Sequence, residues 1–153
     1  MQKKIIIFFL LLFLSSCGYE ALHSKKNSMN YDYSISQLDL VGHREINLKI
    51  KQKLNNYTST KKDKDFKLKI SSTSEKIILA KDTLGDPTTF QIKIAITVDV
   101  LNNYELKSSF TILEDFNYNN ISDKFDLKRY EEEIQNNLAE TATDKIIFRL
   151  SNV

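Results

Sequence analysis

The sequence has few of the residues from which common catalytic and metal sites are built. Its 153 residues contain one cysteine, one proline, three glycines and no tryptophan, and its two histidines are His23 and His43. A single cysteine cannot form an intramolecular disulfide, and two histidines without a cysteine cluster do not suggest a metal centre. Three glycines leave no glycine-rich phosphate loop, and no Gly-x-Ser-x-Gly nucleophile motif is present. We therefore expect neither an enzyme nor a metalloprotein.

A strong excess of charge of one sign is also missing. The chain has 22 basic and 20 acidic residues, a formal net charge of +2 at pH 7. Lys3 and Lys4 account for that excess, and they lie in a segment that we expect to be removed. A protein that binds nucleic acid without sequence preference usually has a basic surplus, so no nucleic-acid partner is expected.

The amino terminus has the layout of a secretory signal peptide. Lys3 and Lys4 precede an unbroken apolar run, Ile5–Leu14, which small residues follow. A membrane-spanning helix would need about 20 apolar residues, and this run has ten. Residues 1–16 are therefore predicted to be a cleaved signal peptide and not a membrane anchor.

Cys17 follows Leu14, Ser15 and Ser16, and these four residues resemble the lipobox of bacterial lipoproteins. The alternative is a buried apolar cysteine, but the polar residues 18–30 offer no core. The resemblance implies an N-acyl diglyceride on Cys17, and acyl chains stabilise membrane attachment by about 0.8 kcal/mol per buried methylene. No other cofactor is expected. By the same resemblance, Gly18 in place of an aspartate favours sorting to the outer membrane.

Residues 17–30 are predicted to be a lipidated, flexible tether, and residues 31–153 a single domain. The segment 31–41 alternates and predicts a first strand. The segment 43–57 places Ile46, Ile50, Leu54 and Tyr57 on one stripe of a helix. The charged segment 59–65 that follows is expected to be a solvated loop.

The next segments predict a sheet built from hairpins. A second strand runs over 66–80, and its change of phase suggests a bulge near Ser74. Asp82–Thr88 contains Gly85, Asp86 and Pro87 and predicts a turn, in which Asp82 and Asp86 bond the backbone and do not form an acid/base pair. Phe90–Val100 alternates cleanly between apolar and polar residues.

A tight hairpin at Asn102 and Asn103 should lead into a fourth strand, 105–118. A final helix is predicted from about Asp126, with Asp126 or Asp123 as its cap. Its apolar stripe is Leu127, Tyr130, Ile134, Leu138, Ala142, Ile146 and Leu150.

These elements, in the order strand, helix, three strands, helix, predict an α+β two-layer sandwich. Both helices would cover one face of a four-stranded, mostly antiparallel sheet. The strand order within the sheet stays open, because one crossover and two hairpins allow more than one arrangement. The other face would stay wet or meet a partner, and it would carry Lys67, Lys69, Lys93, Lys107, Ser109 and Thr111.

Several segments in this order resemble LptE, the lipoprotein that joins the LptD barrel in the outer membrane. They are Cys17-Gly18-Tyr19 with Leu22, the helix at 44–54, Ala80–Thr83, Phe90–Val100 and Phe116–Asn120. They span nearly the whole mature chain, although none of them is a catalytic signature. The chain departs from some relatives in its short turn around Gly85 and in the lack of an extended carboxyl tail.

The resemblance implies a plug inside an LptD-type β-barrel, on the periplasmic side of the outer membrane, that helps assemble the barrel and deliver lipopolysaccharide. Lipopolysaccharide carries phosphates, so exposed cations could meet its head group. The candidates are Lys81, Lys93, Lys107 and Lys124. Each of them could equally be a solubilising lysine. We expect Lys81 and Lys124 to lie close together in the fold.

Two other classes of protein share parts of this pattern. An auxiliary lipoprotein of a lipid-exporting transporter would have the same anchor and size but would work in the periplasm without a barrel. A purely structural envelope lipoprotein would show a long coiled-coil pattern, which the sequence lacks.

Overall fold

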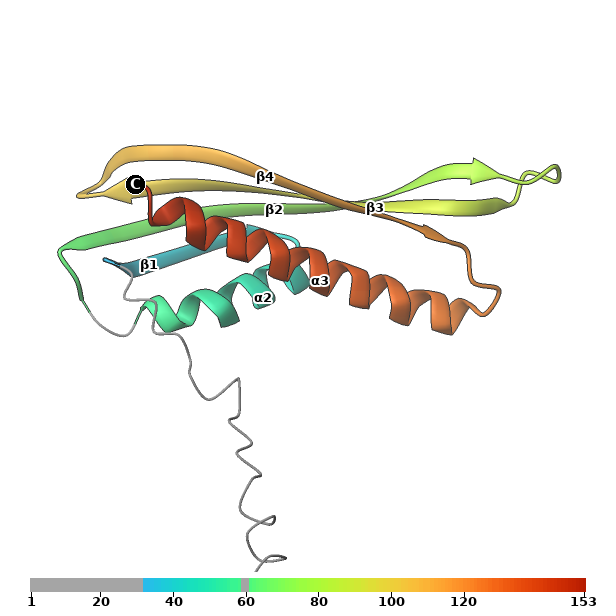
Figure 1. The fold of residues 1–153 in the computed structure, drawn as a ribbon, viewed down its shortest axis with the longest axis horizontal. Coiled ribbons are helices and arrows are strands. Elements are labelled where there is room, and N and C mark those ends of the chain that lie inside the picture. The colour runs from blue at the N-terminus through green and yellow to red at the C-terminus, as the bar shows by residue number, and fades with distance from the viewer. Residues whose placement is uncertain (1–31, 59–60) are drawn as a thin grey trace, which may run out of the picture. The chain divides into compact units, whose positions relative to one another are not determined.

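The computed structural model describes residues 32–58 and 61–153. The elements follow the predicted order: β1 (Tyr33–Gly42), α2 (Arg44–Leu54), the 3-10 turn η1 (Asn55–Tyr57), β2 (Lys64–Lys81), β3 (Pro87–Asn102), β4 (Glu105–Asn119) and α3 (Lys124–Leu150). Both helices lie on one face of the sheet, so the chain forms two layers (Figure 1). The predicted α+β sandwich is confirmed.

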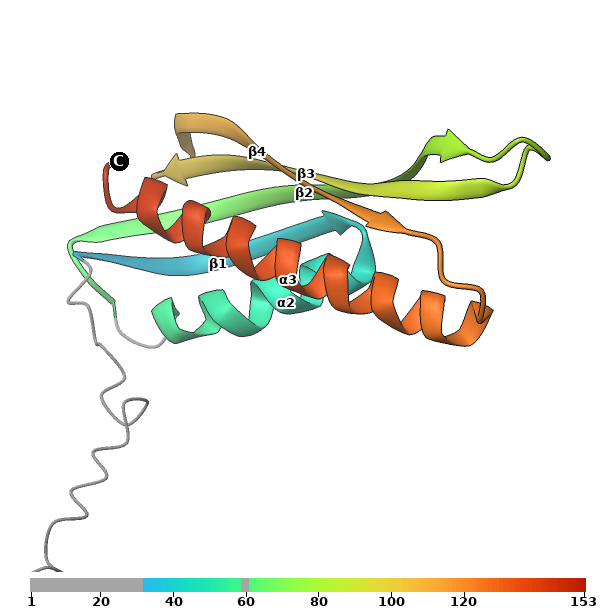
Figure 2. The same ribbon diagram turned by 45° about the vertical axis from the view of Figure 1, so that its right-hand side comes forward.

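The sheet has the strand order β1-β2-β3-β4, which the sequence had left open. β1 runs parallel to β2, while β2, β3 and β4 form antiparallel hairpins. The parallel pair needs a crossover, and α2 supplies it. Figure 2 shows α3 running diagonally beneath the strands, beside α2.

β1 changes phase within its length. The register with β2 shifts between Ile35 and Gln37, so Ile35 faces the core while Val41 is exposed. Gly42 ends the strand at φ +103, where its Cα lies so close to β2 that an added Cβ would be 2.0 Å from the carbonyl oxygen of Ser72. Only glycine fits this junction between β1 and α2.

The bulge predicted near Ser74 is wrong. β2 continues without a register shift from Lys67 to Ile78, and the irregularities lie on either side of Ala80. The apolar pattern fades at Ser72, Ser74 and Lys76 because these core-phase residues have polar partners. Ser74 accepts a hydrogen bond from Gln135 of α3 at 3.2 Å.

The β3–β4 turn lies one residue further along the chain than predicted. Asn102 pairs with Glu105, and the turn residues Asn103 and Tyr104 have φ values of 50° and 67°. Asparagine accepts this left-handed geometry readily, whereas tyrosine does so less often.

The core lies between the sheet and the two helices. Its largest fully buried side chains are Ile35, Ile46, Ile50, Leu54, Leu68, Ile70, Ile92, Ile94, Ile96, Ile146, Leu150 and Val98. α3 buries most of its predicted stripe and also Ala139, Thr143 and Ile147, since it packs against α2 as well as the sheet. Asp123, and not Asp126, caps the helix, accepting from the backbone N–H groups of Phe125 and Asp126.

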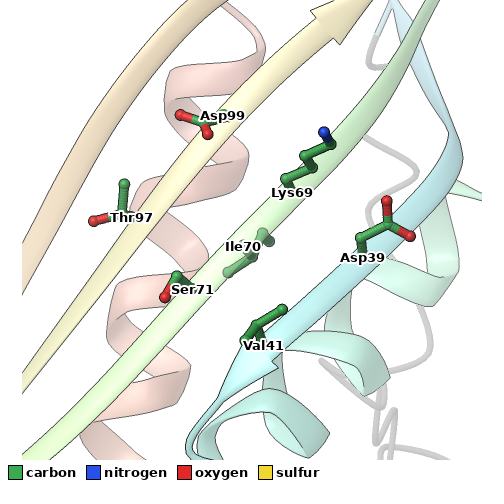
Figure 3. A pocket seen from close by; sticks show the side chains of 7 residues that line it. All are labelled: Asp39, Val41, Lys69, Ile70, Ser71, Thr97 and Asp99. Atoms are coloured by element: carbon green, nitrogen blue, oxygen red, sulfur yellow. The ribbon is translucent and has the colours of Figure 1, made fainter.

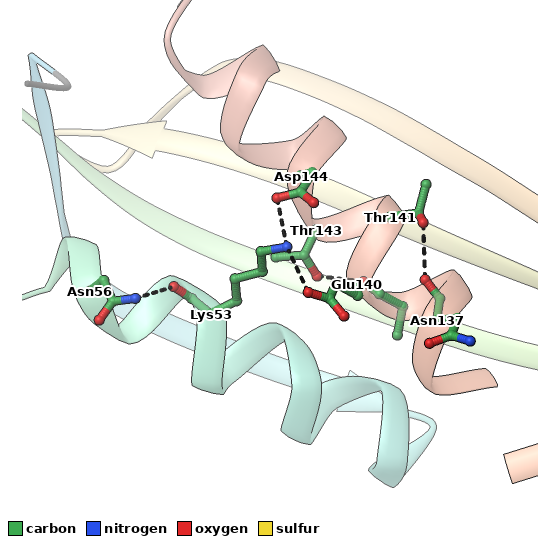
Figure 4. Close-up of polar contacts among 8 residues, drawn as sticks. Lys53, Asn56, Asn137, Glu140, Thr141, Thr143 and Asp144 are labelled. Carbon is green, nitrogen blue, oxygen red and sulfur yellow. Dashed lines mark hydrogen bonds and ion pairs between the residues drawn. The ribbon is translucent and has the colours of Figure 1, made fainter. Parts of the chain in front are cut away.

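Polar contacts flank the packing of α2 against α3 (Figure 4). The ammonium of Lys53 lies 2.7 Å from Asp144 and 3.5 Å from Glu140, one turn apart on α3. Within α3, the buried Thr143 hydroxyl donates to the carbonyl of Ala139 at 2.6 Å, so it needs no partner from α2. The small Ala139 and the internally bonded Thr143 let the helices approach closely.

Candidate functional site

The end of the β2–β3 hairpin is the part of the molecule that extends beyond the start of α3 (Figures 1 and 2). Three apolar side chains are exposed along it: Ile78 and Leu79 on β2, and Leu84, which is 86% exposed, in the turn. Exposed apolar side chains grouped on a projecting element are typical of a contact surface. We call the hairpin from Ile77 to Thr89 the distal hairpin.

The tip of the distal hairpin is a rigid, hydrogen-bonded turn. The Asp82 carboxylate accepts from the backbone N–H groups of Leu84 at 2.8 Å and Asp86 at 2.9 Å. The backbone N–H of Asp82 also donates to the carbonyl of Asp86 at 2.9 Å, and Gly85 adopts φ +92. Asp82 therefore serves the turn, as predicted.

At its base, the distal hairpin is joined to α3 through Glu131. One carboxylate oxygen of Glu131 accepts from the Tyr118 hydroxyl at 2.8 Å and from the Lys76 ammonium at 2.5 Å. The Lys76 ammonium also lies 4.0 Å from the centre of the Phe90 ring. We call Lys76, Phe90, Tyr118 and Glu131 the hinge cluster.

Aromatic packing makes the hinge cluster compact. The rings of Phe90 and Tyr118 stack at 5.6 Å, and Tyr130 of α3 meets Tyr118 edge-on at 6.0 Å. Burial raises the pKa of the Tyr118 hydroxyl well above its ordinary value, and the Glu131 carboxylate raises it further. The hydroxyl therefore stays protonated and can only donate toward Glu131 at neutral pH.

The four candidate lysines lie in three separate environments. Lys81 ends β2 and Lys124 begins α3, and both elements have these ends on the same side of the molecule, Lys81 in the sheet layer and Lys124 in the helix layer. Lys93 lies on the open face of the sheet, between Glu75 and Asp115 on the neighbouring strands.

Lys107 was predicted to lie in the regular pattern of the open face. It is instead the residue of β4 that has no partner on β3, at the point where the β3–β4 register shifts. Its ammonium pairs with Glu105 at 2.9 Å. The surrounding carboxylates lower the local positive potential at both Lys93 and Lys107. Lys81, Lys93 and Lys124 form no ion pair within the described residues, but Lys93 lies opposite two carboxylates whereas Lys81 lies opposite Pro87 and Lys124 begins a helix. Lys81 and Lys124 are therefore the stronger candidates for an anionic ligand.

A hollow of about 160 Å³ lies on the open face of the sheet (Figure 3). It is lined by Asp39, Val41, Lys69, Ile70, Ser71, Thr97 and Asp99. Lys69 lies between Asp39 and Asp99 on the two neighbouring strands, and Asp99 accepts from the Ser109 hydroxyl at 2.6 Å. This row of alternating charge is suited to a polar, hydrogen-bonding partner more than to a bound anion.

Cys17, the signal peptide 1–16 and the tether 17–30 lie outside the described residues, as does His23. Within ranges 32–58 and 61–153, no group of three His, Cys, Asp or Glu side chains could hold a metal. No helix in the same ranges is long and apolar enough to cross a membrane.

The sequence prediction missed the hinge cluster. Lys76 and Glu131 are 55 positions apart, so no local pattern in the sequence pairs them. The available signal was the phase of β2, because Lys76 continues the core-facing series of Phe66, Leu68 and Ile70.

This geometry first defines a class: a two-layer α+β domain in the order β-α-β-β-β-α, with a polar open face and a projecting hairpin. No family model matches the sequence, and no curated protein matches it. Solved structures of bacterial lipoproteins share the fold. Rare lipoprotein B from Shewanella oneidensis matches with a TM-score of 0.60 at 17% identity, over 76% of this chain and 94% of that one.

Two further lipoprotein structures match over similar lengths. The uncharacterized lipoprotein B from Nitrosomonas europaea gives a TM-score of 0.58 at 15% identity, covering 79% of this chain and 86% of that one. A minor lipoprotein from Acinetobacter baumannii gives 0.58 at 13% identity, covering 80% and 92%. At these identities the likeness shows a shared fold. None of the three names describes an enzyme.

Proposed function

We propose that this chain is an outer-membrane lipoprotein, anchored through Cys17, whose domain occupies the lumen of an LptD-type β-barrel. There it helps assemble the barrel and assists the delivery of lipopolysaccharide. The observation that carries the proposal is the fold, which extends over 94% of the rare lipoprotein B structure. The lipobox residues Leu14–Cys17 and the segments that resemble LptE agree with it.

The open face of the sheet has the character that a barrel lumen requires. The lumen of a membrane barrel is polar, so a plug needs a hydrogen-bonding surface without a large apolar patch. Opposite charges alternate across the strands in the rows Asp39–Lys69–Asp99 and Glu75–Lys93–Asp115. Between these rows, the hydroxyls of Thr97 and Thr111 form a hydrogen bond at 3.0 Å.

The distal hairpin is suited to an amphipathic ligand that carries both phosphates and acyl chains. Ile78, Leu79 and Leu84 supply exposed apolar surface. Lys81, beside them, and Lys124, at the start of α3, supply cations that can form charge-assisted hydrogen bonds with phosphate. We therefore place lipopolysaccharide contact at this end of the domain.

An affinity pull-down tests the barrel partner. Full-length tagged protein is purified from detergent-solubilised envelopes, with Cys17→Ala as the control, and its partners are identified by mass spectrometry. We expect a large outer-membrane barrel in roughly equal amount. Recovery of inner-membrane transporter subunits instead would replace the barrel with the auxiliary-lipoprotein function.

A second experiment tests the ligand site. The Lys81→Glu and Lys124→Glu double variant should bind purified lipopolysaccharide more weakly than wild type. The control is Lys49→Glu with Lys51→Glu, which changes the net charge equally at the helix end far from the hairpin. An equal loss in both variants would show general charge attraction, and an unchanged affinity would remove the two lysines from the site.

A further inference from the structure

The balanced overall charge conceals a surplus of lysine at one end of the domain. The last turns of α2, the loop after it and the start of β2 are rich in lysine: Lys49, Lys51, Lys53, Lys61, Lys62, Lys64, Lys67 and Lys69. Tyr33 pairs with Lys64, so the start of β2 lies beside the start of β1, where the described chain begins. We call this end of the domain the basic end.

At least half of these eight lysines form no ion pair in the part of the chain that the structure describes. Within the described ranges, Lys49, Lys51, Lys61 and Lys64 are exposed and form no ion pair. Lys53 differs, because it pairs with Asp144 and Glu140 of α3.

The opposite end of the domain carries charges of both signs. The cap and first half of α3 hold five acidic residues, Asp123, Asp126, Glu131, Glu132 and Glu133, and three basic ones, Lys124, Lys128 and Arg129. The tip of the distal hairpin adds Lys81, Asp82 and Asp86. Figures 1 and 2 place the distal hairpin and the start of α3 at the end away from the start of β1.

Exposed aromatic and apolar side chains accompany the cations at the basic end. Tyr104 in the β3–β4 turn is 81% exposed, Leu106 beside it 60%, and Phe148 near the end of α3 70%. Lys67 lies 3.7 Å from the centre of the Tyr104 ring. Aromatic side chains interleaved with cations are typical of surfaces that lie at the level of lipid head groups.

We propose that the basic end is a second membrane contact, which docks the domain against anionic phospholipid head groups of the leaflet that holds the acyl chains of Cys17. The proposal rests on the lipid attachment proposed above and is independent of the barrel. Residues 17–32 can span at most about 50 Å when fully extended, and a shorter path would let the start of β1 reach the membrane surface. Each cation near an anionic surface contributes about fivefold to binding.

The contact orients the lipoprotein before it meets a partner. With the basic end against the head groups, the distal hairpin points away from the leaflet.

The lone cysteine makes a direct test available. Because Cys17 is acylated in the mature lipoprotein, a Tyr104→Cys substitution introduces the only free thiol for an environment-sensitive fluorophore. Leu84→Cys, at the distal tip, is the matched control. The full-length lipidated protein is reconstituted in phosphatidylcholine vesicles with or without phosphatidylglycerol, and aqueous iodide quenching is measured.

We expect the probe at 104 to be shielded only in the anionic vesicles and to become accessible in high salt, while the probe at 84 stays accessible throughout. Adding Lys61→Glu and Lys64→Glu should weaken the docking equilibrium on anionic vesicles by about 25-fold or more. Lys81→Glu with Lys124→Glu should not weaken it. Equal accessibility at 104 and 84 in anionic vesicles would overturn the proposal, as would equal effects of the two charge reversals.

The mass of the acylated amino-terminal peptide is measured on the same samples. Missing acylation would contradict the anchor. Because the free Cys17 thiol would then also carry the fluorophore, shielding at 104 is measured in that case on a Cys17→Ala background, where retained shielding would support the surface contact. No barrel is present in the vesicles, so failure of the barrel partner cannot produce either result.

Discussion

The Tyr118 hydroxyl donates a 2.8 Å hydrogen bond to Glu131, which joins the last strand of the sheet to the second turn of α3. The same Glu131 oxygen receives the ammonium of Lys76 from β2. Side chains of β2, β4 and α3 therefore meet at one carboxylate. This contact fixes how the distal hairpin leaves the body of the domain.

Tyr118→Phe removes the hydroxyl and keeps the ring that stacks on Phe90. We expect the free energy of unfolding to fall by about 1–2 kcal/mol, because the carboxylate of Glu131 loses a buried donor. Urea unfolding measures it. The control is Tyr130→Phe, which keeps the edge-on ring contact and should change stability by less than about 0.5 kcal/mol. Equal effects of the two substitutions would contradict a specific role for the Tyr118 hydrogen bond.

Tyr118 should also make the free energy of unfolding depend on pH in the alkaline range. An unfolded tyrosine ionises near its ordinary pKa of 10.0, whereas the pKa of Tyr118 in the folded chain is raised. The stabilisation is fully present below pH 10 and is lost as the pH rises above it, since the unfolded chain then releases a proton that the native chain retains. Urea unfolding across this range should show a steeper loss of stability for wild type than for Tyr118→Phe. Parallel curves would mean that Tyr118 titrates normally.

The two positive-φ glycines allow strain and steric overlap to be separated. The Cβ that Gly85→Ala adds has no atom within 4 Å. The free energy of unfolding should therefore fall only by the cost of placing alanine at a positive φ, about 1–2 kcal/mol. Gly42→Ala adds a Cβ 2.0 Å from the carbonyl oxygen of Ser72, and we expect a loss above about 4 kcal/mol or failure to fold. Soluble yield and urea unfolding measure both variants. Similar stabilities would show that β1 and β2 can separate at this junction.

Much of the fold could be predicted from local patterns. The alternation over Phe90–Val100 is reproduced by the burial of every second side chain, and the helical stripe Ile46, Ile50 and Leu54 is fully buried. These patterns are visible in the sequence because periodicity depends only on which face of an element meets the core.

The errors arose where a distant element decides the outcome. Ser74 looked like a break in β2 because its partner, Gln135, is 61 residues away on α3. The strand order was open for the same reason, since hydrophobic patterning is similar for central and edge strands. The candidate lysines could be named as exposed cations, but only the strand register shows that Lys93 lies between two carboxylates.

Asp123 should stabilise the start of α3, and its effect should depend on pH. The backbone N–H groups of Asp126 and Phe125 lower the pKa of its carboxyl group. That contribution is present above the ordinary pKa and is lost as the pH falls through the lowered value. Asp123→Ala should lower the melting temperature at neutral pH. Asp123→Asn should retain most of the stabilisation by the cap, because asparagine also caps helices. If the difference between wild type and Asp123→Ala does not shrink in acid, the charged cap is not the cause.

The two faces of the sheet should respond differently to the loss of an apolar side chain. Ile96 is fully buried beneath the helices, so Ile96→Ala should lower the free energy of unfolding by about 2–5 kcal/mol. Leu113, on the open face beside Ala95, is 58% exposed, and Leu113→Ala should change the stability of the isolated protein by less than about 0.5 kcal/mol.

Barrel co-purification provides the second measurement on the same pair. If the open face meets a barrel wall, Leu113→Arg should reduce recovery of the barrel while leaving the melting temperature of the isolated protein unchanged. Ile96→Val keeps the open face intact, so it should leave barrel recovery at the wild-type level even though it slightly lowers stability. Normal recovery with Leu113→Arg would mean that this part of the sheet faces water in the complex, since a barrel wall packed against it could not accommodate the longer, charged side chain.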